Sequence, residues 1–444
     1  MKISNGVKIL EKLEKFIFYF FIFSIPLQTR KILFIMPEGK FLEWNSGFLY
    51  FTDLLLIAIF VLWTLRLLFK KSGSPKRLDF WLIGFFLIAG LSLITSLNIN
   101  LSIYKLIKLA EFILLFLYIK YNLEFLKLKK ILNILVISGV FESLIAIAQF
   151  FNQSSLGLKH VEAGIYNANI PGVATFFASG VKFIRAYGTT PHPNILGAFL
   201  VVSIFCLYAL WLKENKSKSY FYLLFSIFYF LLFLGLFLTF SRAIIIVFFG
   251  ASLFFFFIAF MRCKEQRPKI IALFFLFLVV CLFFIIIFWP EFKARFLGTS
   301  LGEQAVTLRV YYNDIALSAI KEKPILGLGM GNFVWYLLNN YHLKEFWLYQ
   351  PVHNIYLLIA SEIGIFGLIM FLIFIGKILL KEIKKFFFEN MRLLEICFGF
   401  QILCFLFLGL IDHYFWTIQQ SSLVFWIVLG IISGLAPIAQ LDKA

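Results

Sequence analysis

The chain has 444 residues, of which 62% are hydrophobic, 20% aromatic and only 14% charged, with a formal net charge of +18. This balance excludes a soluble domain, because so few polar side chains cannot cover a water-exposed surface. The positive net charge does not indicate nucleic-acid binding, because the lysines and arginines cluster between apolar runs. Basic clusters in such positions determine the topology of membrane proteins.

Apolar runs of roughly 18 to 22 residues recur along the chain, and this length crosses a hydrocarbon core of about 30 Å. They predict an all-α polytopic membrane protein with about twelve transmembrane helices, forming a single integral membrane domain over residues 1–444. The first run follows several lysines and has no small-residue cleavage site after it, so we expect a signal anchor that is retained. The expected spans are 16–28, 48–65, 79–97, 101–119, 131–151, 193–212, 219–239, 242–261, 270–289, 353–376, 393–411 and 414–436.

Connections on the N-terminal side of these spans hold roughly twice as many lysines and arginines as those on the other side, which predicts that both termini are cytoplasmic. The five cysteines lie in spans or in a cytoplasmic connection, so no disulfide framework is expected. No cysteine and histidine cluster has the spacing of a metal site, and we expect neither a metal nor a cofactor.

Two connections are long, and both fall on the expected external side. One is the loop 152–192, and the other is the segment 290–352 between the ninth and tenth spans. The second has nearly balanced charges, which favours a folded helical cap, and its stretch 307–320 has apolar positions at helical spacing. Long loops in compact proteins are usually functional, so we expect the working face here, although inert spacers are the alternative.

Ser241 and Arg242 separate the seventh and eighth spans almost without a loop. Ser241 is a plausible N-cap, which puts Arg242 in the first helical turn, where a cation opposes the helix dipole. A positive side chain at that position is explained if it binds an anion together with the free amide groups of the first turn. The simpler reading is an arginine that reaches to the lipid head groups.

His353 and Asn354 open the tenth span. An imidazole with an ordinary pKa near 6.5 suits proton transfer, although a histidine at a helix start is often only a cap or interface residue. Glu362 lies nine residues later and about 180° around the helix, so we expect it not to orient His353 and read it as structural. Arg309, in the 290–352 segment, has no distinguishing feature by itself.

Other candidates lie before these positions. Arg185 is a possible phosphate or sugar contact, and Pro193 suits the first turn of a span that His192 caps. Lys105 and Lys108 share one helix face with Glu111, which predicts either a lysine–glutamate pair or a basic patch for a diphosphate. The glycines of residues 327–331 form either a simple turn or an anion-binding nest.

Residues 150–380 resemble the O-antigen ligase and O-antigen polymerase superfamily of bacterial membrane glycosyltransferases. Four stretches carry the resemblance through their order, together with the spans and the long segment before His353. They are Arg185 with Pro191-His192-Pro193-Asn194, then Ser241-Arg242, then Arg309 with Pro324-Ile325-Leu326-Gly327-Leu328-Gly329, and finally His353-Asn354-Ile355-Tyr356 with Ser361-Glu362-Ile363-Gly364-Ile365-Phe366-Gly367.

The resemblance implies a metal-independent, inverting transfer of a glycan from an undecaprenyl-diphosphate donor to an acceptor hydroxyl. The location implied is the external face of the bacterial inner membrane. Arg242 and Arg309 are then expected to neutralise the diphosphate and His353 to act as general base. The expected partners are the lipid-linked donor, a glycan or glycolipid acceptor and the bilayer, without nucleic acid. The expected substrate contacts are Arg185, His192, Asn194, Asn354, Lys105 and Lys108.

Several functions stay open at this level. A ligase, a polymerase of cell-surface polysaccharide and an enzyme of protein O-glycosylation all fit the same residues, and the 290–352 segment has no obvious domain for lipid A. A transporter or flippase of lipid-linked glycans is the alternative from another class, because Asp53 and Glu142 are intramembrane carboxylates. No internal repeat is visible, which argues against that alternative, and a purely structural membrane scaffold is the remaining possibility.

Overall fold

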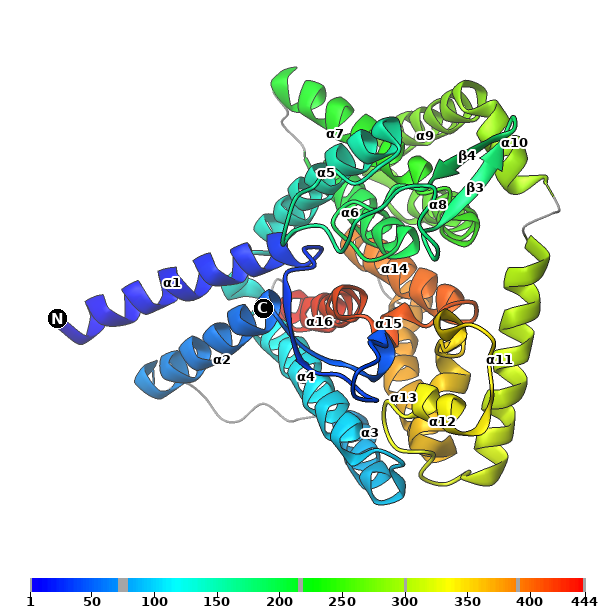
Figure 1. The fold of residues 1–444 in the computed structure, drawn as a ribbon. Coiled ribbons are helices and arrows are strands. Elements are labelled where there is room, and N and C mark those ends of the chain that lie inside the picture. Colours follow the sequence, from blue (N-terminus) through cyan, green and yellow to red (C-terminus); the bar gives the residue numbers. More distant parts are fainter. Residues whose placement is uncertain (1, 71–78, 215–218, 299–301, 389–391, 442–444) are drawn as a thin grey trace.

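The computed structural model describes residues 2–70, 79–214, 219–298, 302–388 and 392–441, and these are mainly helical. Twelve long helices form the bundle (Figure 1). They are α1 (Lys2–Ser24), α2 (Phe51–Lys70), α3 (Phe80–Leu91), α4 (Ile99–Leu126), α5 (Leu128–Asn152), α6 (Pro193–Lys213), α7 (Ser219–Leu238), α8 (Arg242–Arg262), α9 (Arg267–Ile287), α13 (Ile355–Phe388), α14 (Leu393–Gly409) and α16 (Gln419–Leu441).

Each predicted span overlaps one of these helices, and the mainly helical structure fits the predicted all-α membrane class. Within the described residues, seven helices are long and apolar enough to cross a membrane, and three shorter apolar helices add to them. The count of twelve spans therefore stays a prediction. The predicted second span is wrong at its start, because residues 47–50 form a strand and the helix begins at Phe51.

Two small antiparallel sheets were not predicted from the sequence. Strand β1 (Arg30–Phe34) pairs with β2 (Gly47–Tyr50), and β3 (Thr175–Ala178) pairs with β4 (Val181–Ile184). The link between β1 and β2 carries the short 3₁₀ helix η1 (Glu43–Asn45). Both hairpins lie in connections between helices, where apolar periodicity gives no signal.

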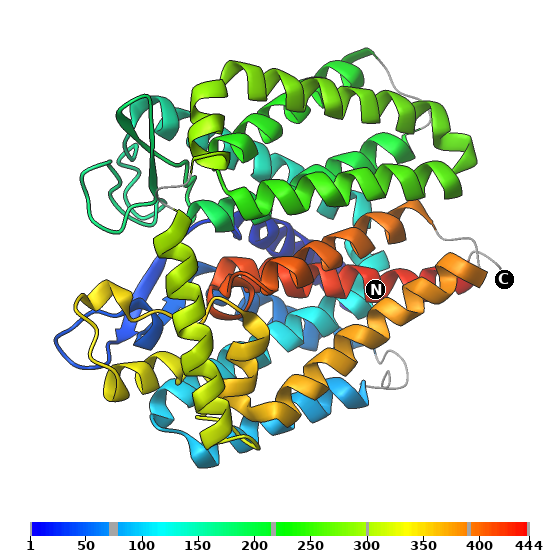
Figure 2. The same cartoon turned by 90° about the vertical axis from the view of Figure 1, so that its right-hand side faces the viewer.

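The 290–352 segment is helical, as predicted. It holds α10 (Trp289–Phe296), α11 (Gly302–Glu322), α12 (Phe333–Asn340) and η4 (Phe346–Leu348), and α11 contains the predicted helix 307–320. Residues 299–301 of this segment lie outside the described residues. Figure 2 shows α11 and α12 at the same end of the bundle as both hairpins and the loop 152–192, with the C-terminus at the other end. We call this the loop end.

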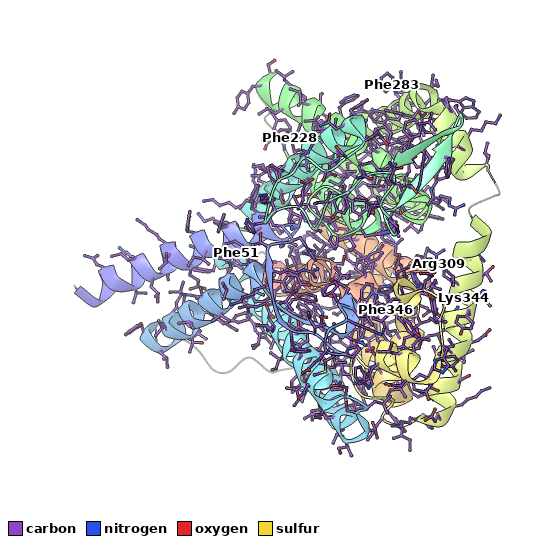
Figure 3. All side chains as sticks on the ribbon, viewed as in Figure 1. Phe51, Phe228, Phe283, Arg309, Lys344 and Phe346 are labelled. Atoms are coloured by element: carbon purple, nitrogen blue, oxygen red, sulfur yellow. The ribbon has the colours of Figure 1, made fainter. Side chains whose placement is uncertain are left out.

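The bundle core centres on α6, which is almost completely buried and packs against α5, α7 and α14. Aromatic rings fill much of the space between helices, and side chains such as Phe228 and Phe283 line its outer helices (Figure 3). A second, smaller core joins α11 and α12 to the start of α13 through residues such as Tyr312 and Phe333. The 290–352 segment is therefore packed onto the bundle and not a loose connection.

A kink in α13 holds the glycine-rich stretch 324–329 against the bundle. Gly364 has φ +79°, and a Cβ atom there would lie 1.9 Å from the carbonyl oxygen of Ile325. Gly327 has φ +68° and also packs closely on the backbone of Glu362. Only glycine allows such a close approach of two backbones. This packing explains the glycines at 327 and 364 without an anion-binding nest.

Three short elements complete the connections between the helices, namely α15 (Tyr414–Thr417), η2 (Ser92–Thr95) and η3 (Lys264–Gln266). Of these, α15 packs against α16 and α14.

Candidate functional site

A cavity of about 650 Å³ opens at the loop end, and most predicted site residues line it. Its walls come from six separate parts of the chain, so no single motif builds it. Its polar lining residues include Arg30, Glu43, Arg185, His192, Asn194, Ser241, Arg242, Arg295, Arg309, Gln350, His353, Asp412 and His413. We call it the arginine cavity.

The tight turn between α7 and α8 supplies one wall. Phe240 is buried and has φ +43°, a strained conformation for a residue with a side chain. Ser241 occupies the N-cap position of α8, but its hydroxyl makes no capping hydrogen bond. It donates instead to Asn194 Oδ1, at 2.8 Å. The first-turn amide groups of α8 therefore have no side-chain cap, beside the guanidinium of Arg242.

Arg185 is fixed by neighbours from three elements. Its Nε donates to the carbonyl oxygen of Thr239 at 2.7 Å, and its Nη2 donates to Asn194 Oδ1 at 2.7 Å. The amide nitrogen Nδ2 of Asn194 donates in turn to Asp412 Oδ2 at 2.9 Å. This chain of hydrogen bonds joins the loop 152–192, the start of α6 and the end of α14.

Five arginines line the cavity. Arg30 is paired with Glu43, and the other four are Arg185, Arg242, Arg295 and Arg309. None of these four forms an ion pair within the described part of the chain. Burial and the positive charge of Arg295 lower the pKa of Arg185 to about 9. Burial, Arg242 and Arg309 likewise lower the pKa of Arg295 to about 10. Four cations in the lining of one cavity outnumber the Asp412 carboxylate beside them and favour the binding of an anion.

Arg309 comes from the upper end of α11, above Lys344 and Phe346 of the same segment (Figure 3). Its Nε atom is buried and has no hydrogen-bond partner among the described residues. Local sequence also offers Glu303 or Asp314 as a partner for Arg309; no ion pair joins Arg309 to Asp314, and the side chain of Glu303 lies outside the described residues. A buried donor without a partner costs free energy, so this group is poised to bind a ligand oxygen.

His353 lies just before α13, next to two groups that follow α14. Its ring centroid is 4.9 Å from that of His413, and Tyr312 stacks on its other side at 6.0 Å. Its Nδ1 atom is buried without a hydrogen-bond partner among the described residues. Burial lowers the pKa of His353, and the carboxylate of Asp412 opposes that shift. The imidazole is therefore neutral at neutral pH and able to accept a proton.

Asp412 stays ionised at neutral pH. Burial alone would raise its pKa, but His353, His413 and His192 together bring the pKa below its usual value. Burial lowers the pKa values of His192 and His413 to about 3. The site therefore holds one carboxylate and three neutral imidazoles beside the four arginines.

His353, Asp412 and His413 also form a group that could hold a metal ion, with ligand atoms all within 4.8 Å of one another. The sequence did not suggest this group, because its members are far apart in the chain. Nitrogen and oxygen donors of this kind suit zinc or iron. The four neighbouring guanidinium groups, however, make the local potential positive, which opposes a dication and favours an anion.

Other predicted residues lie outside the arginine cavity. Asn354 is engaged as a helix cap, because its Oδ1 accepts from the amide groups of Tyr356 and Leu357. Lys105 and Lys108 line a second, smaller cavity that shares only Glu43, Trp44 and Ile418 with the first.

The ammonium of Lys108 is neutralised there, at 2.6 Å from Asp53 and 2.8 Å from Glu111. For Lys108 the contacts therefore support the predicted lysine–glutamate pair and not the basic patch for a diphosphate. Glu362 also lines the second cavity, where it accepts from Trp416 Nε1 at 3.1 Å. It does not orient His353, as the helical spacing predicted.

His192 caps α6, as predicted: its Nδ1 accepts from the amide of Asn194 at 3.1 Å, and Pro193 occupies the first turn. Accepting at Nδ1 leaves the ring proton of the neutral imidazole on Nε2. Sequence reasoning missed several residues of the cavity, among them Arg295, Asp412 and His413. A polar pair in the short connection after α14 was the one signal that could have pointed to Asp412 and His413.

Residues 227–372 match the family model described as O-antigen ligase, and a search of curated proteins found no match. The matched stretch contains Arg242, Arg295, Arg309 and His353, which all line the arginine cavity. Over residues 227–372 the chain is therefore similar to the O-antigen ligase family, and this similarity supports an activity of the type used in cell-surface polysaccharide synthesis.

Proposed function

We propose that this protein is a metal-independent, inverting glycosyltransferase of the bacterial inner membrane. It transfers a glycan from an undecaprenyl-diphosphate donor to an acceptor hydroxyl at the external face. The observation that carries the proposal is the arginine cavity, whose lining combines a neutral, buried imidazole with four guanidinium groups that form no ion pair among the described residues. This combination suits a reaction that releases a diphosphate and removes one proton.

The diphosphate binds at the arginine side of the cavity. Arg242 and Arg309 contact its oxygens, and the first-turn amide groups of α8 add further donors. Arg309 offers the buried Nε that has no partner among the described residues. Arg185 and Arg295 are held by backbone carbonyl groups, Thr239 for the first and Phe240 for the second. They contribute positive charge from fixed positions, which costs no reorganisation during the reaction.

His353 removes the proton from the acceptor hydroxyl. As the proton moves to the imidazole, the acceptor oxygen forms its bond to the anomeric carbon. The bond from that carbon to the diphosphate oxygen breaks, and undecaprenyl diphosphate leaves with the electron pair. Asp412 stabilises the imidazolium that forms, because it is ionised and lies within 4.8 Å of the donor atoms of His353 and His413. Direct displacement inverts the anomeric centre.

A transporter or flippase is the less favoured function. It was suggested by Asp53 and Glu142, but both carboxylates have internal partners. Asp53 accepts from Lys108 and from Gln419, at 2.6 and 2.7 Å. Glu142 accepts from the amide and the hydroxyl of Thr189, both at 2.7 Å, and so anchors the loop 152–192 to α5. These contacts explain both residues structurally, without ion coupling.

The test is a transfer assay with purified protein in detergent. The donor is an undecaprenyl-diphosphate oligosaccharide, a chelator is present, and products are separated by size. A ladder of longer lipid-linked glycans identifies a polymerase, and transfer that requires an added glycolipid or protein identifies a ligase or a protein O-glycosylating enzyme. Movement of the lipid across liposomes without any covalent change overturns the enzyme proposal in favour of a flippase.

A further inference from the structure

Another part of the arginine cavity lining has a different chemistry. There the lining residues Phe41, Trp44 and Tyr166 are aromatic, and Arg30 and Glu43 form an ion pair through both guanidinium nitrogens. Most of these come from the β1–β2 hairpin and its 3₁₀ helix η1. This part of the chain lies outside the residues that match the family model. We call Arg30, Phe41, Glu43 and Trp44 the hairpin wall.

The hairpin wall is held rigidly in place. Leu42 is buried in the second core with α11 and α12, and Trp44 packs against both cores. The guanidinium carbon of Arg30 lies 3.9 Å from the centre of the Phe48 ring. The Arg30 and Glu43 side chains still keep 18% and 25% of their surface exposed, so their outer atoms face the cavity. A fixed surface of this kind binds without a large ordering cost.

Trp44 is connected to the proposed base through two ring contacts. Its ring meets that of His413 edge to face, with the centroids 4.9 Å apart. The ring of His413 meets that of His353 at the same centroid distance, 4.9 Å. A molecule resting on the hairpin wall therefore lies beside the group that would remove its proton.

The chemistry of the hairpin wall fits a sugar ring. A pyranose has an apolar face of C–H groups, which packs on flat aromatic rings, and a rim of hydroxyl groups that both donate and accept hydrogen bonds. Glu43 accepts such bonds and Arg30 donates them, and their pairing leaves the wall with no net charge. A diphosphate gains no electrostatic binding energy from this neutral pair, and a neutral sugar gains little binding energy from the four arginines.

We propose that the hairpin wall is the acceptor subsite, and that its occupant is a sugar ring of a glycan rather than a protein side chain. This inference rests on the proposed function and adds the class and the place of the acceptor. The donor diphosphate and the acceptor sugar then occupy different parts of one cavity, whose lining also includes His353.

Two probes separate the two walls. The first is undecaprenyl diphosphate, and the second is the free, neutral oligosaccharide released by mild acid from the lipid-linked glycans of the producing cell. Binding of each to purified full-length protein is measured by calorimetry or by saturation-transfer NMR. We expect Trp44→Ala to weaken oligosaccharide binding about tenfold or more, since tenfold corresponds to about 1.4 kcal/mol, and to leave undecaprenyl diphosphate binding within about twofold. Arg242→Ala should do the reverse.

Matched variants control for folding. Trp347→Ala removes an exposed tryptophan of the 290–352 segment and should bind both probes as the wild type does. Trp44→Phe keeps an aromatic ring, and Glu43→Gln removes only a charge, so these carry the test if Trp44→Ala does not fold. Both should bind the oligosaccharide more weakly than the wild type.

The outcomes are distinguishable. Wild-type oligosaccharide affinity in Trp44→Ala, or equal loss of both probes in Trp44→Ala and Trp44→Phe, overturns the acceptor subsite. A wild-type protein that binds the oligosaccharide but not undecaprenyl diphosphate overturns the proposed donor, and leaves the hairpin wall as a sugar site.

Discussion

Asn194, at the start of α6, donates a hydrogen bond of 2.9 Å to Asp412, which follows α14 and lies 218 residues later in the chain. The same amide group accepts from Arg185 and from Ser241 through its oxygen. The Asn194 side chain thus links Arg185 and Ser241 to the carboxylate of Asp412 beside His353. It joins the anion-binding part of the cavity to the part that handles the proton.

Replacing His353 by alanine should reduce the transfer rate by about 10² to 10⁴, because the acceptor hydroxyl loses its base. Donor binding should change little. The matched control is His342→Ala, which removes an exposed histidine of the 290–352 segment. Initial rates of the transfer assay check this prediction, and full activity in His353→Ala would remove the general-base assignment.

Replacing Arg309 by alanine should reduce transfer by about 10² or more, since one positive contact to the developing diphosphate charge is lost. Arg242→Ala should act in the same way. Lysine at either position should recover only part of the rate, because an ammonium cannot contact two oxygens in one plane. Lys321→Ala, on the exposed side of α11, serves as control. Equal rates for Arg309→Ala and Lys321→Ala would contradict the role of Arg309.

Replacing Asp412 by asparagine should slow transfer by about tenfold or more and move the acid limb of the pH profile. The carboxylate raises the pKa of His353 against the effect of burial, so its removal lowers that pKa further. The acid limb of kcat/KM should therefore shift to lower pH. Asp314→Asn, at an exposed position of α11, should leave both rate and profile unchanged. A slower variant with an unshifted profile would point to a structural role only.

Acid should destabilise the fold through its buried histidines. In the folded protein, burial lowers the pKa values of His192 and His413 to about 3, whereas in the unfolded chain they return to about 6.5. The unfolded state then binds more protons between these values, so the free energy of unfolding decreases as pH falls from about 6.5 toward 3.

Thermal unfolding in detergent at a series of pH values measures this slope. His413→Gln should have a shallower slope than the wild type, and His160→Gln, at an exposed loop position, should have the same slope. Identical slopes in all three proteins would exclude His413 as a source of the acid sensitivity.

Chelation should not change the transfer rate. His353, Asp412 and His413 are close enough to hold a metal ion, but the adjacent guanidinium groups raise the electrostatic cost of a dication. The rate is measured before and after treatment with EDTA, and bound metal is measured by elemental analysis of the purified protein. Loss of activity on chelation, with recovery on adding zinc, would assign this group to a metal instead of a proton.

Hydropathy alone was sufficient for the class of protein and for the positions of the long helices. Burial of apolar runs in a membrane depends on length and composition, which are local properties of the chain. Local chemistry also predicted the cap at His192, the helix in 307–320 and the position of Arg242 in a first turn. These features depend on a few neighbouring residues and are therefore visible in the sequence.

The composition of the cavity was decided by tertiary packing. Arg295 looked like one basic residue among several, and Asp412 and His413 looked like an ordinary short connection. They become a site because α6, α8, α11, α13 and α14 bring their ends together. Asn354 and Lys108, in contrast, were predicted to contact the substrate but do not line this cavity. Their polar groups are satisfied by nearby partners. Hydrogen bonds and charges act over a few ångströms in space, and separation along the chain does not report those distances.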